Sequence, residues 1–268
     1  MNQADDRRGS ASTRAMMASP TSSNLGGRGL FITGTDTGAG KTEATLALMA
    51  HLAARGQRVL GMKPVASGCE PVMESMRDQG AGAAQTPAPS GPVLCNADAL
   101  RIQDQGDRRM PYDWINPYAF EPAIAPHLAA EAAGIQIQIE PILTAYQRLA
   151  AEADWVLVEG VGGWLVPFGA QSSLADLAER LGLPVVLVVG LKLGCLNQAL
   201  LTEEAMRARG MAPCGWIGCQ VESGMAALDG NIRTLRQRMQ SPCLGILPWM
   251  TDPTPEVLAE SLELTRFL

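Results

Sequence analysis

Residues 34–42, Gly34-Thr-Asp-Thr-Gly-Ala-Gly-Lys-Thr42, decide the fold. They follow the apolar run GLFIT at 29–33 and open TEATLALMAHLAARG at 42–56, where apolar residues recur at helical spacing. Glycines in such a turn let backbone N–H groups converge on phosphate oxygens, and the helix start adds a partial positive charge. Counted from Gly34, the spacing is one residue longer than GxxxxGKT. The stretch predicts a phosphate-binding loop; the alternative is a strand–helix turn without chemistry.

Two charged residues follow other apolar runs. Glu159 ends WVLVE at 155–159 and precedes glycines, and Lys63 comes directly after RVLGM at 58–62. In open α/β sheets, ligands bind at the carboxyl ends of the strands. We therefore expect Glu159 to help hold the magnesium of a nucleotide, and Lys63 to form an anion-binding crevice with Lys41. Solvated strand-end side chains are the alternative for both.

The whole chain repeats this strand–helix alternation. Strands are expected at 30–33, 58–62, 155–158, 185–189, 214–218 and 244–247. Helices are expected at 41–54, 122–133, 140–153, 173–181, 196–209, 225–239 and 256–264. Several of the strands are continuous apolar runs, which is typical of strands covered on both faces. The pattern predicts an α/β fold with a doubly wound, mostly parallel sheet.

The domain organisation follows from composition along the 268 residues. Residues 1–28 mix small, polar and charged residues without periodicity, which predicts a disordered N-terminal extension. Residues 29–268 are then one domain. A segment rich in Ala, Pro, Gly and Gln at about 70–95 is expected to be a flexible surface insertion.

Composition excludes several classes of function. Only two histidines are present, which argues against a His-rich zinc site and a Ser/His/Asp triad. The net charge of −6 and the lack of a basic tract argue against nucleic-acid binding. Six cysteines form no CxxC pair and no apolar run reaches about 18 residues, so we expect reduced thiols, no membrane span and a cytoplasmic protein.

Several further motifs follow the loop in a fixed order. They are KPVASG at 63–68, NADA at 96–99, NPYAFEPAIAPH at 116–127, VEGVGGWLVP at 158–167, LPVVLVVGLKLGCLNQALLT at 183–202, GW at 215–216 and LGILPW at 244–249. From about Leu30 to Trp249 the chain closely resembles the dethiobiotin synthetase family. The resemblance implies a P-loop NTPase type of fold, a homodimer and ligase activity in biotin biosynthesis. The expected substrates are 7,8-diaminopelargonate, CO₂ and ATP, and the products are dethiobiotin, ADP and phosphate, through a carbamate and a carbamic–phosphoric anhydride.

The resemblance also implies roles for individual residues. Catalysis would involve Lys63, Lys41 and Thr37. ATP would be bound by Gly38, Ala39, Gly40, Lys41, Thr42, Glu43, Asp98, Glu159, Gly160, Val161, Gly162, Cys219, Gln220, Pro248, Trp249 and Met250. Mg²⁺ would be held by Thr42, Asp98 and Glu159. The substrate would be bound by Thr37, Lys63 and Ser67, and, from the partner subunit, by Gly194, Cys195, Leu196 and Asn197.

Departures from the family pattern leave other functions open. Gly38 stands where an acidic residue is common, and Cys219 with Gln220 stands where an Asn contacting adenine is common. A partitioning or metal-delivery ATPase is one alternative, but it would have a lysine at the position of Asp36, which argues against it. A nucleotide-binding homologue with weakened activity, and an amide synthetase of the cobyrinate type, are the further alternatives.

Overall fold

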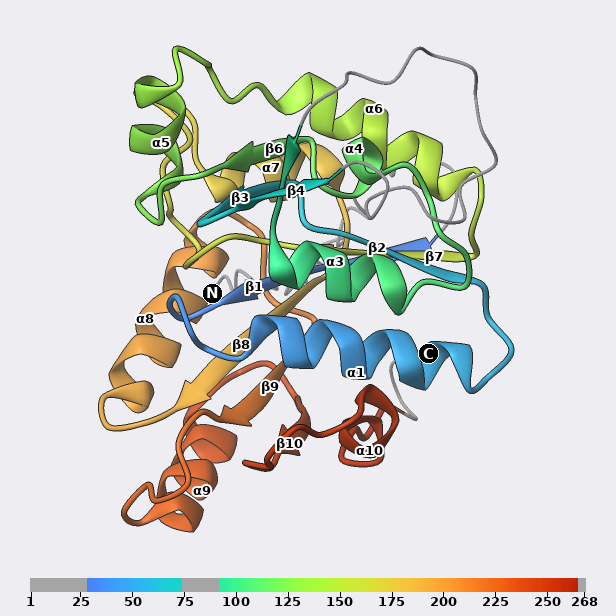
Figure 1. Ribbon diagram of the computed structural model, residues 1–268. Helices are drawn as coiled ribbons and strands as arrows, with labels where there is room; N and C mark the ends of the chain where they lie inside the picture. The colour runs from blue at the N-terminus through green and yellow to red at the C-terminus, as the bar shows by residue number, and fades with distance from the viewer. Residues whose placement is uncertain (1–27, 74–91, 265–268) are drawn as a thin grey trace, which may run out of the picture.

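The computed structural model describes residues 28–73 and 92–264, and its centre is a six-stranded sheet (Figure 1). The strands are arranged in the order β10-β9-β8-β1-β7-β2, and every neighbouring pair is parallel. Their bounds are β1 (Arg28–Gly34), β2 (Val59–Met62), β7 (Trp155–Glu159), β8 (Val185–Leu191), β9 (Gly215–Gln220) and β10 (Cys243–Leu247). These are the six strands predicted from the sequence, and the doubly wound parallel fold is confirmed.

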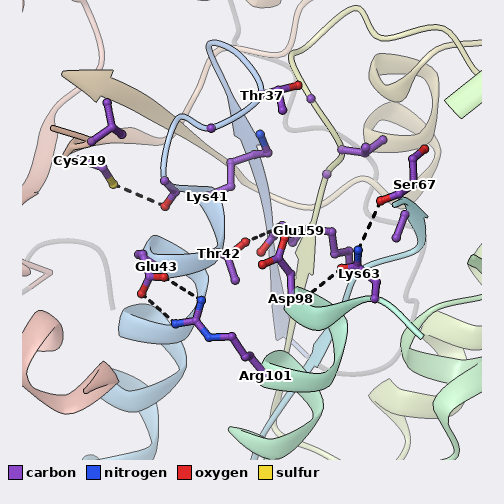
Figure 2. A pocket seen from close by; sticks show the side chains of 18 of the residues that line it. Thr37, Lys41, Thr42, Glu43, Lys63, Ser67, Asp98, Arg101, Glu159 and Cys219 are labelled. Atoms are coloured by element: carbon purple, nitrogen blue, oxygen red, sulfur yellow. Dashed lines mark hydrogen bonds and ion pairs between the residues drawn. The ribbon is translucent and has the colours of Figure 1, made fainter. Parts of the chain in front are cut away.

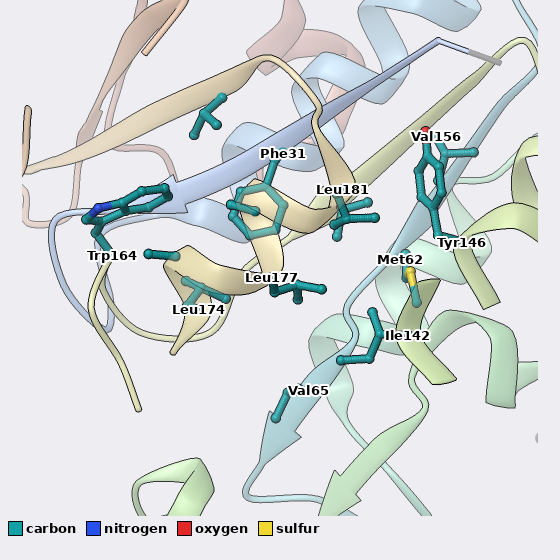
Figure 3. Close-up of a cluster of buried hydrophobic side chains, with 14 of the residues drawn as sticks. Phe31, Met62, Val65, Ile142, Tyr146, Val156, Trp164, Leu174, Leu177 and Leu181 are labelled. Atoms are coloured by element: carbon teal, nitrogen blue, oxygen red, sulfur yellow. The ribbon is translucent and has the colours of Figure 1, made fainter. Parts of the chain in front are cut away.

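Helices cover both faces of the sheet because its strands are apolar on both sides. Phe31 points to the face that packs against α6 (Ile139–Ala150) and α7 (Leu174–Leu181), as Figure 3 shows. Its neighbours Leu30 and Ile32 point to the opposite face, which packs against α1 (Lys41–Ala53). Burying each such side chain contributes about 1.5–3 kcal/mol, so both layers stabilise the central strand.

Three further helices extend these two layers. The helices α8 (Cys195–Ala208) and α9 (Leu228–Arg238) pack in the same core as α6 and α7, and α10 (Pro255–Ala259) lies against α1. Within residues 28–73 and 92–264, no helix is long and apolar enough to cross a membrane.

The order of the strands determines where the site lies. After β1 the chain runs to β2, returns to β7 beside β1, and then continues on the other side of β1 with β8. Such a reversal of strand order opens a crevice at the carboxyl ends of the strands. The ends of β1, β2 and β7 therefore meet at one edge, where the residues after Gly34, Met62 and Val158 lie together.

Short elements that the sequence patterns did not predict surround this edge. Two small sheets pair β3 (Val65–Ser67) with β6 (Tyr118–Phe120), in parallel, and β4 (Glu70–Met73) with β5 (Pro92–Cys95), antiparallel. Two further helices, α3 (Ala97–Asp104) and α4 (Tyr112–Ile115), were not predicted either, and the predicted helix α5 (Pro126–Ala132) completes the fold. Each of the four short strands has only three residues or contains a proline, so no strand pattern could be recognised.

Two predicted helices differ from the structure by four or more residues at one end. The helix expected from 122 begins only at Pro126, because the residue before a proline disfavours the helical region and proline is well suited to the first helical position. The helix expected to reach 264 ends at Ala259, after which Leu262 forms a β-bridge with Gly245.

Two predicted irregular segments lie largely outside the described residues. Both ends of the 70–95 segment form the strands β4 and β5, and its centre, 74–91, is not among the residues described. Of the expected N-terminal extension, only Arg28 is described, and it begins β1.

Candidate active site

A cavity of about 1200 Å³ lies at the carboxyl ends of the strands (Figure 2). Most of the residues predicted to bind nucleotide, metal or substrate line it. They are Thr37, Gly38, Gly40, Lys41, Thr42, Glu43, Lys63, Ser67, Asp98, Glu159, Gly160, Val161, Gly162, Cys219, Gln220, Pro248, Trp249 and Met250. The predicted residues that do not line it are Ala39, Gly194, Cys195, Leu196 and Asn197.

The phosphate loop has the backbone that its glycines predict. Gly38 and Gly40 have φ angles of 71° and 88°, which residues with a side chain rarely adopt. A Cβ on Gly40 would also lie 2.6 Å from the Cβ of Cys219. Gly40 caps α1 without any side-chain hydrogen bond to the helix start. The first amides of α1 therefore remain available for an anion.

Lys41 lies buried beneath this loop. Its Nζ donates a hydrogen bond of 2.9 Å to the backbone oxygen of Asp36, across the loop. Burial is the largest influence on the ammonium and lowers the pKa of Lys41 to about 8; the nearby Lys63 acts in the same direction and Glu159 opposes it. A bound phosphate would restore the charge, since an opposite charge favours the ionised form.

Lys63, Glu159 and Thr42 form a buried network with Asp98. The Nζ of Lys63 lies 2.8 Å from Oε1 of Glu159 and 2.6 Å from Oδ2 of Asp98. The Thr42 hydroxyl donates to the same Oε1 of Glu159 at 2.9 Å. The Glu159 side chain is 0% exposed, so its charge depends on these partners. We call Lys41, Thr42, Lys63, Asp98 and Glu159 the phosphate region.

The charges in this region stabilise one another. Burial disfavours the ammonium of Lys63, but the carboxylates of Glu159 and Asp98 outweigh it and raise the pKa of Lys63 above its usual value. Burial likewise disfavours the Asp98 carboxylate, but the ion pair with Lys63 outweighs it and lowers the pKa of Asp98. Lys63 and Asp98 are therefore both charged at neutral pH.

The same residues could hold a divalent cation. Oε2 of Glu159 is buried and has no hydrogen-bond partner within 28–73 and 92–264, and an unpaired buried carboxylate oxygen is costly unless a ligand binds it. The hydroxyl of Thr42 and the carboxylate of Asp98 face the same space (Figure 2). Hard oxygen donors of this kind suit Mg²⁺. No group of three or more His, Cys, Asp or Glu is present there, so two carboxylates and a hydroxyl would share the ion with phosphates.

Two asparagines support Lys63 and Asp98, and motif reasoning gave neither a role at the site. Asn116 Nδ2 donates to the backbone oxygen of Lys63 at 2.7 Å. The Oδ1 of Asn96 accepts from the amides of Asp98 and Ala99, and so caps α3. Both asparagines are buried. In the sequence, only Asn96 gave a signal, because an asparagine at the start of the NADA motif indicates the cap of a helix.

The far end of the cavity is formed by a different set of residues, Cys219, Gln220, Pro248, Trp249 and Met250, which we call the loop region. Oε1 of Gln220 accepts a hydrogen bond of 2.7 Å from the backbone N–H of Trp249. The Cys219 thiol is buried against Gly40, and its Sγ lies 3.6 Å from the oxygen of that residue. Trp249 is 50% exposed. Polar groups are few here, and apolar surface is open to a planar ligand.

The turn before α8 lies apart from the cavity. Gly194 has a φ of 95° and caps α8 without a side-chain hydrogen bond to the helix start. Leu193 at the tip of the turn is 96% exposed. Lys192, which follows β8, forms an ion pair of 3.4 Å with Asp36 of the phosphate loop. The amide of Cys195 donates to the carbonyl oxygen of Lys192, and the Gly194–Asn197 turn does not line the cavity of its own chain.

Comparisons with known proteins agree on one family. The model of the AAA domain family matches residues 28–257. Proteins named ATP-dependent dethiobiotin synthetase BioD are 43% identical over 236 residues in Xanthomonas oryzae pv. oryzae, and 42% identical over 235 residues in Pseudomonas paraeruginosa. These alignments cover 88% and 87% of this chain and 97% and 95% of the relatives.

Among solved structures, the MinC:MinD cell division protein complex of Aquifex aeolicus matches with a TM-score of 0.49 and 12% identity, over 88% of this chain and 87% of that one. The family assignment rests on the curated relatives, which are matched over most of this chain and nearly all of their own length. Joined to the phosphate loop and the lysine–carboxylate network, these relatives show that the chain belongs to the ATP-dependent dethiobiotin synthetase family.

Proposed function

We propose that this chain catalyses the ATP-dependent carboxylation and ring closure of 7,8-diaminopelargonate with CO₂, to give dethiobiotin, ADP and phosphate. The observation that carries the proposal is the pairing of Lys63 with Glu159 and Asp98 beside the phosphate loop. This places a buried, charged lysine where a nucleotide phosphate and a second anion would meet. The names of the curated relatives give ATP and the product, dethiobiotin, and the resemblance to their family implies the other substrates.

The chemical difficulty is repulsion between anions. One amine of the substrate captures CO₂ as a carbamate, whose oxygen then attacks the γ-phosphorus of ATP and releases ADP. Both partners are negative, so Lys63 and Lys41 would lower the barrier by neutralising them, as preorganised charges do in low-dielectric sites. Thr37 and Ser67 would hold the carbamate and the amine. The second amine attacks the carbonyl of the mixed anhydride, closes the ureido ring and expels phosphate.

Mg²⁺ would be held by Thr42, Asp98 and Glu159 together with phosphate oxygens. When bound, it would supply positive charge to the β- and γ-phosphates. Asp98 and Glu159 would then both bind the metal and pair with Lys63. Lys63 would thereby be oriented by the same carboxylates that orient the metal.

A homodimer would complete the site. The Gly194–Asn197 turn does not line its own cavity, and the nearby Leu193 is 96% exposed. We propose that this turn of one subunit binds the substrate carboxylate in the cavity of the other, through amides at the start of α8.

A cytoplasmic location accords with the six cysteines, none of which forms a disulfide.

The test is a direct assay of the purified protein. Diaminopelargonate, bicarbonate and Mg·ATP would be supplied, and dethiobiotin and ADP followed by mass spectrometry. We expect equal amounts of the two products. ATP hydrolysis without dethiobiotin would favour an ATPase switch, and nucleotide binding without turnover would favour a weakened homologue; either result would contradict the proposal.

A further inference from the structure

An ion pair at the rim of the cavity involves a residue to which the motifs give no role. The two terminal nitrogens of the Arg101 guanidinium, Nη1 and Nη2, donate to Oε1 and Oε2 of Glu43 at 2.8 Å and 3.1 Å. Figure 2 shows the pair beside Thr42 and Asp98, and both residues line the cavity. Two parallel bonds fix the relative orientation of the two side chains better than a single contact does.

The pair joins the two helices that bear the proposed metal residues. Glu43 directly follows Thr42 in the first turn of α1. Arg101 lies three residues after Asp98 on α3, and residues three apart share a helix face. The face of α3 that presents Asp98 to the site therefore also presents Arg101 to α1.

The pair uses other groups than the contact that Asp98 makes with Lys63 at 2.6 Å, although the charge of Arg101 also acts on the Asp98 carboxylate and helps to lower its pKa. If the proposed function holds, Asp98 also binds the metal and Lys63 also faces the carbamate, so their contact is shared with new partners when the substrates bind. The bond from Arg101 to Glu43 involves neither residue and would persist.

We propose that Arg101 is a positioning residue of the metal site, which holds α3 against α1 through Glu43 so that Asp98 and Thr42 bind the same cation. This inference rests on the proposed function, since that function supplies the metal. Arg101 acts through Glu43 and contacts neither nucleotide nor metal. Removing Arg101 should therefore weaken only the part of nucleotide binding that depends on magnesium.

Calorimetric binding of a non-hydrolysable ATP analogue, with Mg²⁺ and with EDTA, tests this. In Arg101→Met, we expect a loss of about three- to fivefold in affinity with Mg²⁺, because half-exposed ion pairs contribute modestly, and no change in EDTA. In Glu43→Gln, whose side chain lines the cavity, the ratio of the affinities with Mg²⁺ and with EDTA should fall by the same factor. The charge-swapped double variant Glu43→Arg/Arg101→Glu should recover most of the loss. The matched control is Arg180→Met, which removes an exposed helix–helix pair of 2.8 Å with Glu140, outside the cavity.

Four results would overturn the proposal. An equal loss in Mg²⁺ and EDTA would mean that Arg101 contacts the nucleotide itself. No loss, or the same loss in Arg180→Met, would leave Arg101 without a specific role. A wild-type protein whose affinity does not respond to Mg²⁺ would remove the metal site altogether. Because the readout is binding, a protein that passes it but makes no dethiobiotin would contradict the proposed function alone.

Discussion

The two ends of the cavity are built in opposite ways. In the phosphate region, Lys63 and Glu159 are buried and held by several partners, and both stand at the carboxyl ends of strands of the central sheet. In the loop region, Trp249 and Met250 are 50% and 41% exposed and follow the last strand. Side chains fixed by a packed sheet can hold reacting groups in one geometry. Exposed loop residues can vary with little cost to the fold, so selectivity for the base can change while the chemistry stays.

Lys63→Ala tests the phosphate region and should give the largest effect. Turnover should fall by about three orders of magnitude, since preorganised charge is lost at the reacting anions. The variant should also lose about 3 kcal/mol of stability, because Glu159 is left buried without its cation. Product formation and urea unfolding are the measurements.

The double variant Lys63→Ala/Glu159→Gln separates these two effects. It removes the unpaired charge, so stability should return while turnover stays low. If Lys63→Ala alone keeps near-normal turnover, Lys63 is not part of the mechanism and the contrast between the two ends fails.

Gly190→Ala tests whether the sheet holds the phosphate loop in place. A Cβ at this position would lie 2.9 Å from the Cα of Ala39, which belongs to the loop backbone and must move. We expect about 1–3 kcal/mol of destabilisation and roughly tenfold weaker nucleotide binding. Gly169→Ala is the control, since its nearest neighbour would be the Ser172 hydroxyl at 3.8 Å. Unchanged affinity in Gly190→Ala would show that the loop can shift freely.

Trp249→Ala tests the loop region and should act on binding only. Stacking of a base on one aromatic ring contributes about 1–3 kcal/mol. Because Trp249 is half exposed, we expect an effect at the lower end of this range, so the KM for ATP should rise by roughly three- to tenfold. The kcat should stay within about twofold because no reacting group is touched. A kcat that falls as far as in Lys63→Ala would erase the distinction between the two ends.

The smallest effect concerns protons. The pKa of Lys41 is lowered to about 8, chiefly by burial, and bound phosphate should raise it. At pH 8 the free protein has Lys41 about half protonated, so nucleotide binding should take up roughly half a proton per site. Affinity should accordingly fall as the pH rises above 8. Calorimetry in buffers of different ionisation enthalpy measures the uptake, and Lys41→Met should abolish it.

The sheet was predictable because its signals are local and strong. Each of the six strands is a short apolar run, most are followed by a helical period, and Gly40-Lys41-Thr42 marks where α1 begins. Glu159 and Lys63 could be placed at one edge because parallel strands end together. These parts of the fold depend on patterns within about ten residues.

The rest depends on contacts between distant segments. Arg101 and Glu43 are 58 residues apart, and nothing near Arg101 in the sequence marks it as a partner of α1. The β3–β6 pair joins strands of three residues whose pattern is too short to recognise. The support of Lys63 by Asn116 is likewise a long-range backbone contact. Such features depend on how distant elements pack against one another, and the local patterns of a single sequence do not reveal that packing.

The exposure of Trp249 has a practical consequence. Of the five tryptophans, Trp155, Trp164 and Trp216 are at most 8% exposed and Trp114 is partly buried, while Trp249 is half exposed at the cavity. The intrinsic fluorescence that responds to a soluble quencher should therefore come mainly from the tryptophan that lines the cavity. Occupancy of the cavity can be followed in the unlabelled protein, by the loss of that response.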